Sequence, residues 1–134
     1  TSERGAVTRT NDPSLLADCK MVIVLTPKGE DAAGVLSWLK EGVVVIDDTH
    51  PQLPPGLIHE ITLKGGEVYR STMGLEGVRS VPRLPGYDER WIPGCVVESL
   101  VVNGGLNNTT QEAFDQKGRG IGLTPFLTNP RGEG

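Results

Sequence analysis

Two short runs of apolar residues, separated by a helix-like segment, restrict the possible folds of this chain more than any other feature. The runs are Met21–Leu25 and Val43–Ile46. Unbroken apolar runs of this length are typical of strands in a parallel sheet, which are buried on both faces. Between them, Glu30 and Asp31 place negative charge in the first turn of a predicted helix, and Leu36 lies on its apolar side. This order predicts a βαβ unit with a right-handed crossover and parallel strands.

The composition fits one globular domain. A chain of 134 residues can bury a real core, and its 18 glycines and 10 prolines cluster from Pro51 onward, which predicts a loop-rich second half. A net charge of −4 argues against nucleic acid or an anionic membrane as the main partner. We expect no transmembrane segment, because no run of about 18 apolar residues occurs. Cys19 and Cys95 form no disulfide framework, so a cytoplasmic location is expected.

The segments after Pro51 carry weaker signals. Residues 57–63 fit either a short helix or an edge strand, and residues 67–72 alternate as a third, less buried strand would. Residues 74–88 are expected to be a loop. Thr109 and Glu112 form a capping-box pattern that predicts a helix, which is followed by a loose tail.

These patterns together predict an α/β fold with a partial Rossmann-like parallel sheet, made of the βαβ unit and one further strand. Residues 1–90 would form the second half of a nucleotide-binding domain. Residues 91–134 would form a C-terminal helical segment, rich in glycine and proline, that carries Cys95 and the loose tail.

Cys95 follows a Pro-Gly pair and precedes an apolar segment with helical spacing. Pro93 suits the start of a helix, where backbone N–H groups and the helix dipole favour a thiolate over a thiol. Cys95 is therefore a candidate nucleophile, and the alternative is a buried small hydrophobic residue. Glu98, one turn later, could act as an acid or base or orient a substrate. It could equally cap the same helix start, and its charge would then oppose thiolate formation.

Three polar segments follow the predicted strands: Thr26–Gly29, Asp47–Pro51 and Ser71–Gly74. Ligands of open α/β sheets bind beyond the carboxyl ends of the strands. If the strands are parallel neighbours, the three segments lie on one rim, and we expect a ligand site there.

Individual residues of this rim allow two interpretations each. His50 could give a proton to a developing alkoxide, or form hydrogen bonds within its own loop. Lys28 could meet a phosphate, or be an ordinary solvated lysine. Asp47 and Asp48 could form a carboxylate pair, or cap the turn that follows. The histidines and cysteines have no recognised metal-ligand spacing, so no metal site is expected.

The order of these segments resembles the long-chain acyl-[acyl-carrier protein] reductases, which use NADPH to reduce a fatty acyl thioester to an aldehyde. The resemblance covers roughly residues 5–126 and the later part of the family's longer polypeptide. The segments that carry it are the strand, Pro27-Lys28-Gly29, a helix, the second strand with its Asp-rich turn, Ile58-His59, Leu63-Lys64-Gly65-Gly66 and Gly94-Cys95-Val96-Val97-Glu98-Ser99-Leu100.

The resemblance implies that Cys95 accepts the acyl group and that the Thr26-Pro27-Lys28 turn lies near the nicotinamide of NADPH or NADH. We expect Cys95, Glu98 and His50 as catalytic residues. The expected cofactor contacts are Thr26, Pro27, Lys28, Asp48 and Thr72. The expected partners are an acyl-carrier protein or acyl-CoA thioester, and a missing amino-terminal half or a second copy.

The sequence departs from the family at several points. No Gly-x-Gly-x-x-Gly fingerprint joins a strand to a helix, so the feature that holds a dinucleotide pyrophosphate is absent. Ile121 stands where the family has a histidine, and the Asp47–His50 turn differs from the family's turn. Two alternatives therefore stay open: a dehydrogenase of the shikimate-dehydrogenase kind, without a covalent step, and a non-catalytic binding or assembly domain derived from a reductase.

Overall fold

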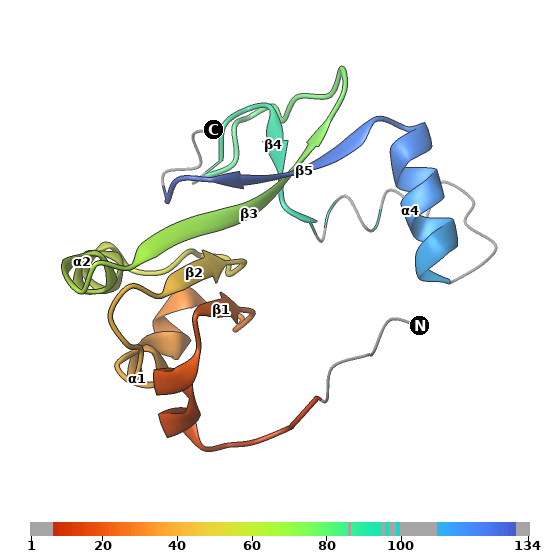
Figure 1. The fold of residues 1–134 in the computed structure, drawn as a ribbon. Coiled ribbons are helices and arrows are strands. Elements are labelled where there is room, and N and C mark those ends of the chain that lie inside the picture. Colours follow the sequence, from red (N-terminus) through yellow and green to blue (C-terminus); the bar gives the residue numbers. More distant parts are fainter. Residues whose placement is uncertain (1–6, 86, 95, 97–98, 100–109, 131–134) are drawn as a thin grey trace.

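The structure is a computed structural model that describes residues 7–85, 87–94, 96, 99 and 110–130. Strands and short helices alternate along the first half, and a helix and a strand close the described part of the chain (Figure 1). The elements in order are η1 (Pro13–Asp18), β1 (Met21–Val24), η2 (Gly29–Ala32), α1 (Ala33–Leu36), β2 (Val44–Asp47), α2 (Pro55–Leu63), β3 (Glu67–Leu75), β4 (Trp91–Ile92), α4 (Gln111–Gly120) and β5 (Leu123–Thr128).

The sheet is built on three parallel strands in the order β1, β2, β3. The expected parallel pairing of the two apolar runs is confirmed, with Val22 opposite Val45. Residues 67–72 form the third strand, which is also parallel and continues to Leu75. Because β3 is long, it also pairs antiparallel with β4 and with β5. The fold is therefore a mixed α/β structure with a partial Rossmann-like sheet.

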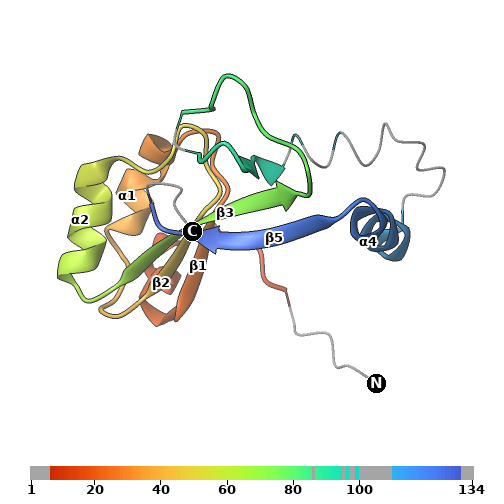
Figure 2. The ribbon, with the colours of Figure 1, turned by 90° about the horizontal axis from the view of Figure 1, so that it is seen from above.

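The helices of the first half lie on one side of the parallel strands (Figure 2). The core on this side is made of strand, helix and loop residues that are almost completely buried. Its members are Val24, Ala32, Leu36, Leu39, Val43, Val45, Leu53, Ile61 and Val68. Val24 of β1, Val45 of β2 and Val68 of β3 point to this side, because side chains alternate between the two faces of a sheet.

The opposite side of β1 is uncovered, which corrects the expectation that this strand is buried on both faces. Met21 and Ile23 are each 57 % exposed and Leu25 is 71 % exposed. The physical reason is that the described helices α1 and α2 both pack on the other side. We call the side of the sheet that carries Met21, Ile23 and Leu25 the open face.

The carboxyl-terminal part differs most from its prediction. The expected loose tail contains β5, which pairs with β3 from Arg70 to Leu75. Backbone pairing with β3, which is distant in sequence, stabilises β5. The local sequence pattern of residues 123–128 does not predict this pairing. The helix before it is capped by Thr110, whose Oγ1 accepts from the Ala113 N–H at 3.2 Å, and not by Thr109.

The structure also decides the open prediction for residues 57–63. The segment 57–63 is helical and lies within α2. The helix after β1 ends at Leu36, and Trp38 just beyond it is half exposed. In the described part of the chain, none of the helices is both long and apolar enough to cross a membrane.

Candidate functional site

The turns after β1 and β2 lie side by side at the carboxyl end of the parallel strands. The Asp48 N–H donates to the Val24 carbonyl at 3.0 Å, and the Gly29 N–H donates to the Pro51 carbonyl at 2.9 Å. Gly29 permits this approach, because a β-carbon added there would lie 2.4 Å from the Leu53 nitrogen. The sequence-based expectation that these two turns meet is therefore confirmed. We call residues 26–29 and 48–51 the rim.

The third expected segment of the rim is not a strand end. Ser71–Gly74 lies inside β3, which runs on to Leu75 because β4 and β5 pair with it there. Thr72 is only 1 % exposed, and its Oγ1 has no hydrogen-bond partner among the described residues. Thr72 therefore belongs to the buried layer behind the rim, and it is not a surface contact for a ligand.

Asp47 holds the turn after β2 in place. Its Oδ1 accepts from the backbone N–H of Thr49 at 2.9 Å and from the Thr49 hydroxyl, and its Oδ2 accepts from the Leu53 N–H at 2.9 Å. Asp47 itself is buried. Of the two interpretations of this carboxylate, the capping of the following turn is the one the structure supports.

Asp48, the next residue, stands on the exposed side of the turn. Partial burial of its carboxyl group raises the pKa of Asp48 above the ordinary value of 3.8, and the neighbouring Asp47 charge raises it further. The positive charge of Arg70 acts in the opposite direction on this pKa. The rim thus contains one carboxyl group that holds a proton more readily than a free aspartate does.

Arg70 is the residue of this region that the sequence-based analysis missed. It is 1 % exposed, and its guanidinium donates to the Gln52 side chain, to the Thr49 carbonyl at 3.3 Å and to the Tyr87 hydroxyl at 2.7 Å. Its Cζ lies 4.5 Å from the centre of the Tyr87 ring. No carboxylate among the described residues forms an ion pair with it. A signal was present, because the alternation of residues 67–72 places Arg70 on the same face as buried Val68.

Arg70 joins two parts of the chain that are distant in sequence. It binds the turn that contains His50 and, through Tyr87, the loop that leads to β4. The ring of exposed His50 lies 6.0 Å from the Tyr87 ring, centre to centre. This buried arginine therefore fixes the position of the His50 turn relative to the polypeptide that precedes Cys95.

Of the other expected residues of the rim, Thr26 is half buried, and Pro27 and Lys28 are exposed. Thr26 donates its hydroxyl proton to the Lys28 carbonyl at 2.8 Å, which closes the turn on itself. The Lys28 ammonium lies 3.8 Å from Glu30 Oε1. Lys28 therefore has the environment of a solvated lysine, although its position at the rim leaves it within reach of a bound ligand.

Cys95 and Glu98 lie outside the described residues. Gly94, directly before Cys95, lies against the open face of β3, and a methyl group added to it would lie 4.0 Å from Met73 Cγ. The other cysteine, Cys19, is half buried, and its Sγ donates to the Leu15 carbonyl at 3.6 Å. Within the described ranges, no group of three or more His, Cys, Asp or Glu could hold a metal ion.

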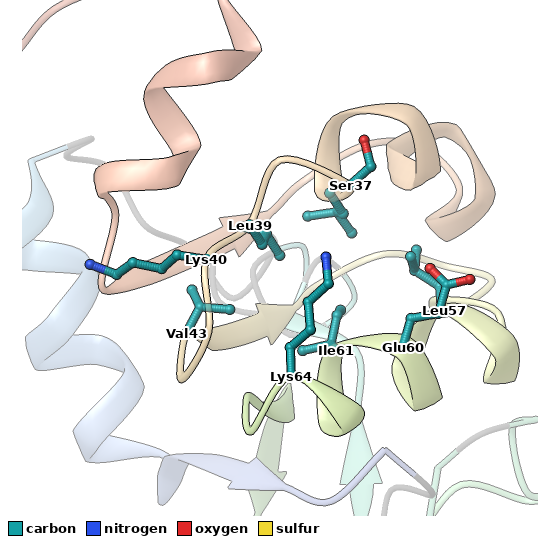
Figure 3. A pocket seen from close by; sticks show the side chains of 9 residues that line it. Ser37, Leu39, Lys40, Val43, Leu57, Glu60, Ile61 and Lys64 are labelled. Carbon is teal, nitrogen blue, oxygen red and sulfur yellow. The ribbon is translucent and has the colours of Figure 1, made fainter.

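A small cavity between α1 and α2 is visible in Figure 3, where Lys64 and Glu60 lie beside apolar side chains that include Ile61, and the Lys40 side chain points away from them. Its volume is about 10 Å³, which is room for about one water molecule. It also lies next to Val43, at the amino end of β2, whereas ligands of open α/β sheets bind at the carboxyl ends. We assign no function to it.

Comparison with models of protein families, with curated proteins and with solved structures finds no match to this chain.

Proposed function

We propose that this chain is part of an NAD(P)H-dependent acyl-thioester reductase, which forms an aldehyde through an acyl group carried on Cys95. The observation that supports it best is the rim, where the turns after two parallel strands are held together by backbone hydrogen bonds. This is the position at which sheets of this kind bind nucleotides. The resemblance of the Gly94–Leu100 segment supplies the reaction class.

The rim fits the nicotinamide end of a dinucleotide better than its pyrophosphate. Pro27, Lys28 and Asp48 present exposed side chains there. Glu30 and Asp31, in the first turn of η2, place negative charge where a pyrophosphate would need positive charge. We therefore propose that Thr26, Pro27, Lys28 and Asp48 surround the nicotinamide, and that other polypeptide holds the phosphates.

The proposed reaction begins with attack of the Cys95 thiolate on the thioester carbonyl. A new carbon–sulfur bond forms at Cys95 as the old one breaks, and the carrier leaves as a thiol after taking up a proton. When bound, the reduced nicotinamide supplies the hydride that converts the acyl group to an aldehyde and frees the thiolate. His50 or Glu98 is proposed to handle protons, and His50 is exposed at the rim.

Acylation in the absence of nicotinamide tests this proposal. The full chain is mixed with an acyl-CoA, and intact mass is measured for the unaltered protein, Cys95→Ala and the matched control Cys19→Ala. We expect one added acyl group on the unaltered protein and on Cys19→Ala, and none on Cys95→Ala. Equal acylation of Cys95→Ala and the unaltered chain would rule the mechanism out.

A second candidate function, a non-catalytic binding or assembly domain, is favoured by the open face. Met21 and Ile23 of β1 and Leu25 directly after it form an exposed apolar row, and β1 has a described neighbour strand on only one edge. Uncovered apolar surface beside a free strand edge is typical of an interface. Stable association without any response to NADPH in a titration would favour this function over the reductase.

A further inference from the structure

We propose that two copies of this chain associate through the free edge of β1, so that one sheet continues across both copies. The partner is a second copy of the same chain, related to the first by a two-fold axis at Ile23. β1 lies at one end of the sheet, and among the described strands only β2 pairs with it (Figure 1). Either candidate function is compatible with such a dimer, since most oligomers of soluble proteins are symmetric assemblies of identical chains.

The backbone of β1 turns hydrogen-bonding groups to this outer edge. The carbonyls of Lys20 and Val24 face the other way, and each accepts from a backbone N–H of β2 or of the turn after it at 3.0 Å. Successive residues of a strand direct these groups to opposite edges, so Met21 and Ile23 direct theirs outward. A free edge of this kind is a template for a further strand.

The edge of β1 lacks the residues that usually prevent such pairing. Natural edge strands often carry a lysine, a proline or a bulge, or are very short. Residues 21–26 contain no charged residue, no proline and no glycine. Of the other outer strands, β5 contains Pro125, which has no N–H to donate, and β4 has only two residues. Among the described strands, β1 is therefore the one best suited to accept a partner.

The exposed side chains of β1 select one register. Met21 and Ile23 are each 57 % exposed and Leu25 is 71 % exposed, all on the open face. A two-fold axis makes the paired strands antiparallel, and residues whose backbone groups point outward then lie opposite one another. With the axis at Ile23, this residue faces Ile23 of the second copy, and Met21 of each copy faces Leu25 of the other. Every exposed apolar side chain therefore gains an apolar neighbour across the strands.

The two neighbouring registers match these side chains less well. An axis at Val22 would leave Leu25 opposite Cys19, which is half buried. An axis at Val24 would leave Met21 opposite Pro27, which again has no N–H to donate. The register centred on Ile23 is thus the one that pairs all three exposed apolar residues.

The charges at the two ends of β1 also fit an antiparallel partner. Asp18 and Lys20 precede the strand, Lys28 and Glu30 follow it, and all four are exposed. Each end carries one positive and one negative side chain, so contact between opposite ends of the two copies brings no net repulsion. In the Ile23 register, Asp18 falls opposite Lys28 of the second copy. One strand edge and three side chains from each copy form a small interface of the weak class, so the chain is monomeric in dilute solution.

Sedimentation equilibrium of the full chain tests the association. We expect a reversible monomer–dimer equilibrium as the concentration rises to about 1 mM. Ile23→Lys sets two like charges opposite one another on the axis and should weaken the dimer about tenfold or more. The matched control is Leu127→Lys, because Leu127 is 56 % exposed on the same face of β5, and this variant should leave the dimer unchanged.

Circular dichroism of both lysine variants verifies that they are folded. A chain that stays monomeric up to about 1 mM would overturn the proposal. Equal weakening of the dimer by the two lysines would overturn it as well, because Leu127 lies on another strand.

A cysteine on the axis tests the register without relying on a loss of association. In a chain that also carries Cys19→Ser and Cys95→Ser, Ile23→Cys brings two α-carbons within about 5.5 Å of each other, a separation that a disulfide spans. We expect a covalent dimer after treatment with oxidised glutathione. With Met21→Cys, the two cysteines are four residues apart along the strands, or about 13 Å, and the chain should stay monomeric. A disulfide that forms as readily from Met21→Cys as from Ile23→Cys would overturn the proposed interface.

Discussion

The guanidinium of Arg70 donates a hydrogen bond to the Tyr87 hydroxyl at 2.7 Å, and its Cζ lies 4.5 Å from the centre of the same ring. The two residues are 17 positions apart and both are buried. This contact connects β3 to the loop that precedes β4, and Arg70 also binds the turn after β2. The buried Arg70 side chain therefore connects the rim to the loop that leads through β4 to Gly94.

Replacing Arg70 by methionine should destabilise the fold by about 3 kcal/mol, because the Thr49 carbonyl, Gln52 and Tyr87 would all lose a charged donor inside the protein. Tyr87→Phe removes only the hydroxyl acceptor and should cost about 1 to 2 kcal/mol. Urea denaturation followed by circular dichroism measures both values. An Arg70→Met variant as stable as the unaltered protein would show that Arg70 does not hold the two loops.

Asp48 should make stability depend on pH in an unusual direction. Its pKa is raised in the folded state, so the folded protein binds its proton more tightly than the unfolded chain does. The resulting destabilisation is fully present above the raised pKa and disappears as the pH falls toward 3.8, the value without burial. Asp48→Asn removes this contribution.

The measurement compares urea midpoints of the unaltered protein and Asp48→Asn at a series of pH values from neutral to acidic. We expect Asp48→Asn to be the more stable of the two at neutral pH, and the difference to shrink as the pH is lowered. A difference that grows toward low pH would mean that folding lowers the pKa of Asp48 and does not raise it.

Gly29→Ala should disturb the contact between the two turns of the rim. The new β-carbon would lie 2.4 Å from the Leu53 nitrogen and 2.5 Å from the Gln52 carbonyl group, and neither backbone atom can move independently. We expect a loss of about 1 to 3 kcal/mol. Thermal unfolding provides the measurement.

The matched control for that variant is Gly34→Ala in α1, where nothing lies within 4 Å of the added β-carbon. Alanine favours a helix over glycine by roughly 0.5 to 1 kcal/mol, so this variant should be slightly more stable than the unaltered protein. Equal destabilisation by both alanines would mean that the close approach at Gly29 is unimportant.

Two isoleucines should respond very differently to truncation. Ile61, on the buried side of α2, is 3 % exposed, and Ile61→Ala should cost about 2 to 5 kcal/mol. Ile23 lies on the open face, and Ile23→Ala should cost no more than about 0.5 kcal/mol in the isolated chain, as for a surface position. Chemical denaturation of the two variants measures the loss of unfolding free energy in each. A large loss for Ile23→Ala would indicate that the open face is covered in solution.

Local patterns account for much of the fold. The two apolar runs, the helix between them and the alternation of residues 67–72 specify parallel strands, because side-chain periodicity and strand propensity act over a few residues. The meeting of the two turns at the rim follows from the same pattern, since carboxyl ends of adjacent parallel strands share one edge. For Asp47, the sequence allowed either a carboxylate pair or a cap of the following turn. The hydrogen bond from the Leu53 N–H, six residues later, supports the turn cap.

The sequence by itself thus determined the βαβ unit, the third parallel strand and two of the three segments expected at the rim. Only the tertiary structure decided that Ser71–Gly74 continues a strand, that β5 joins the sheet at its far edge, and that Arg70 rests on Tyr87. It also left Met21, Ile23 and Leu25 exposed. The physical reason is common to all of these features. Each depends on which distant segments pair or pack together, and the local sequence does not specify those long-range contacts.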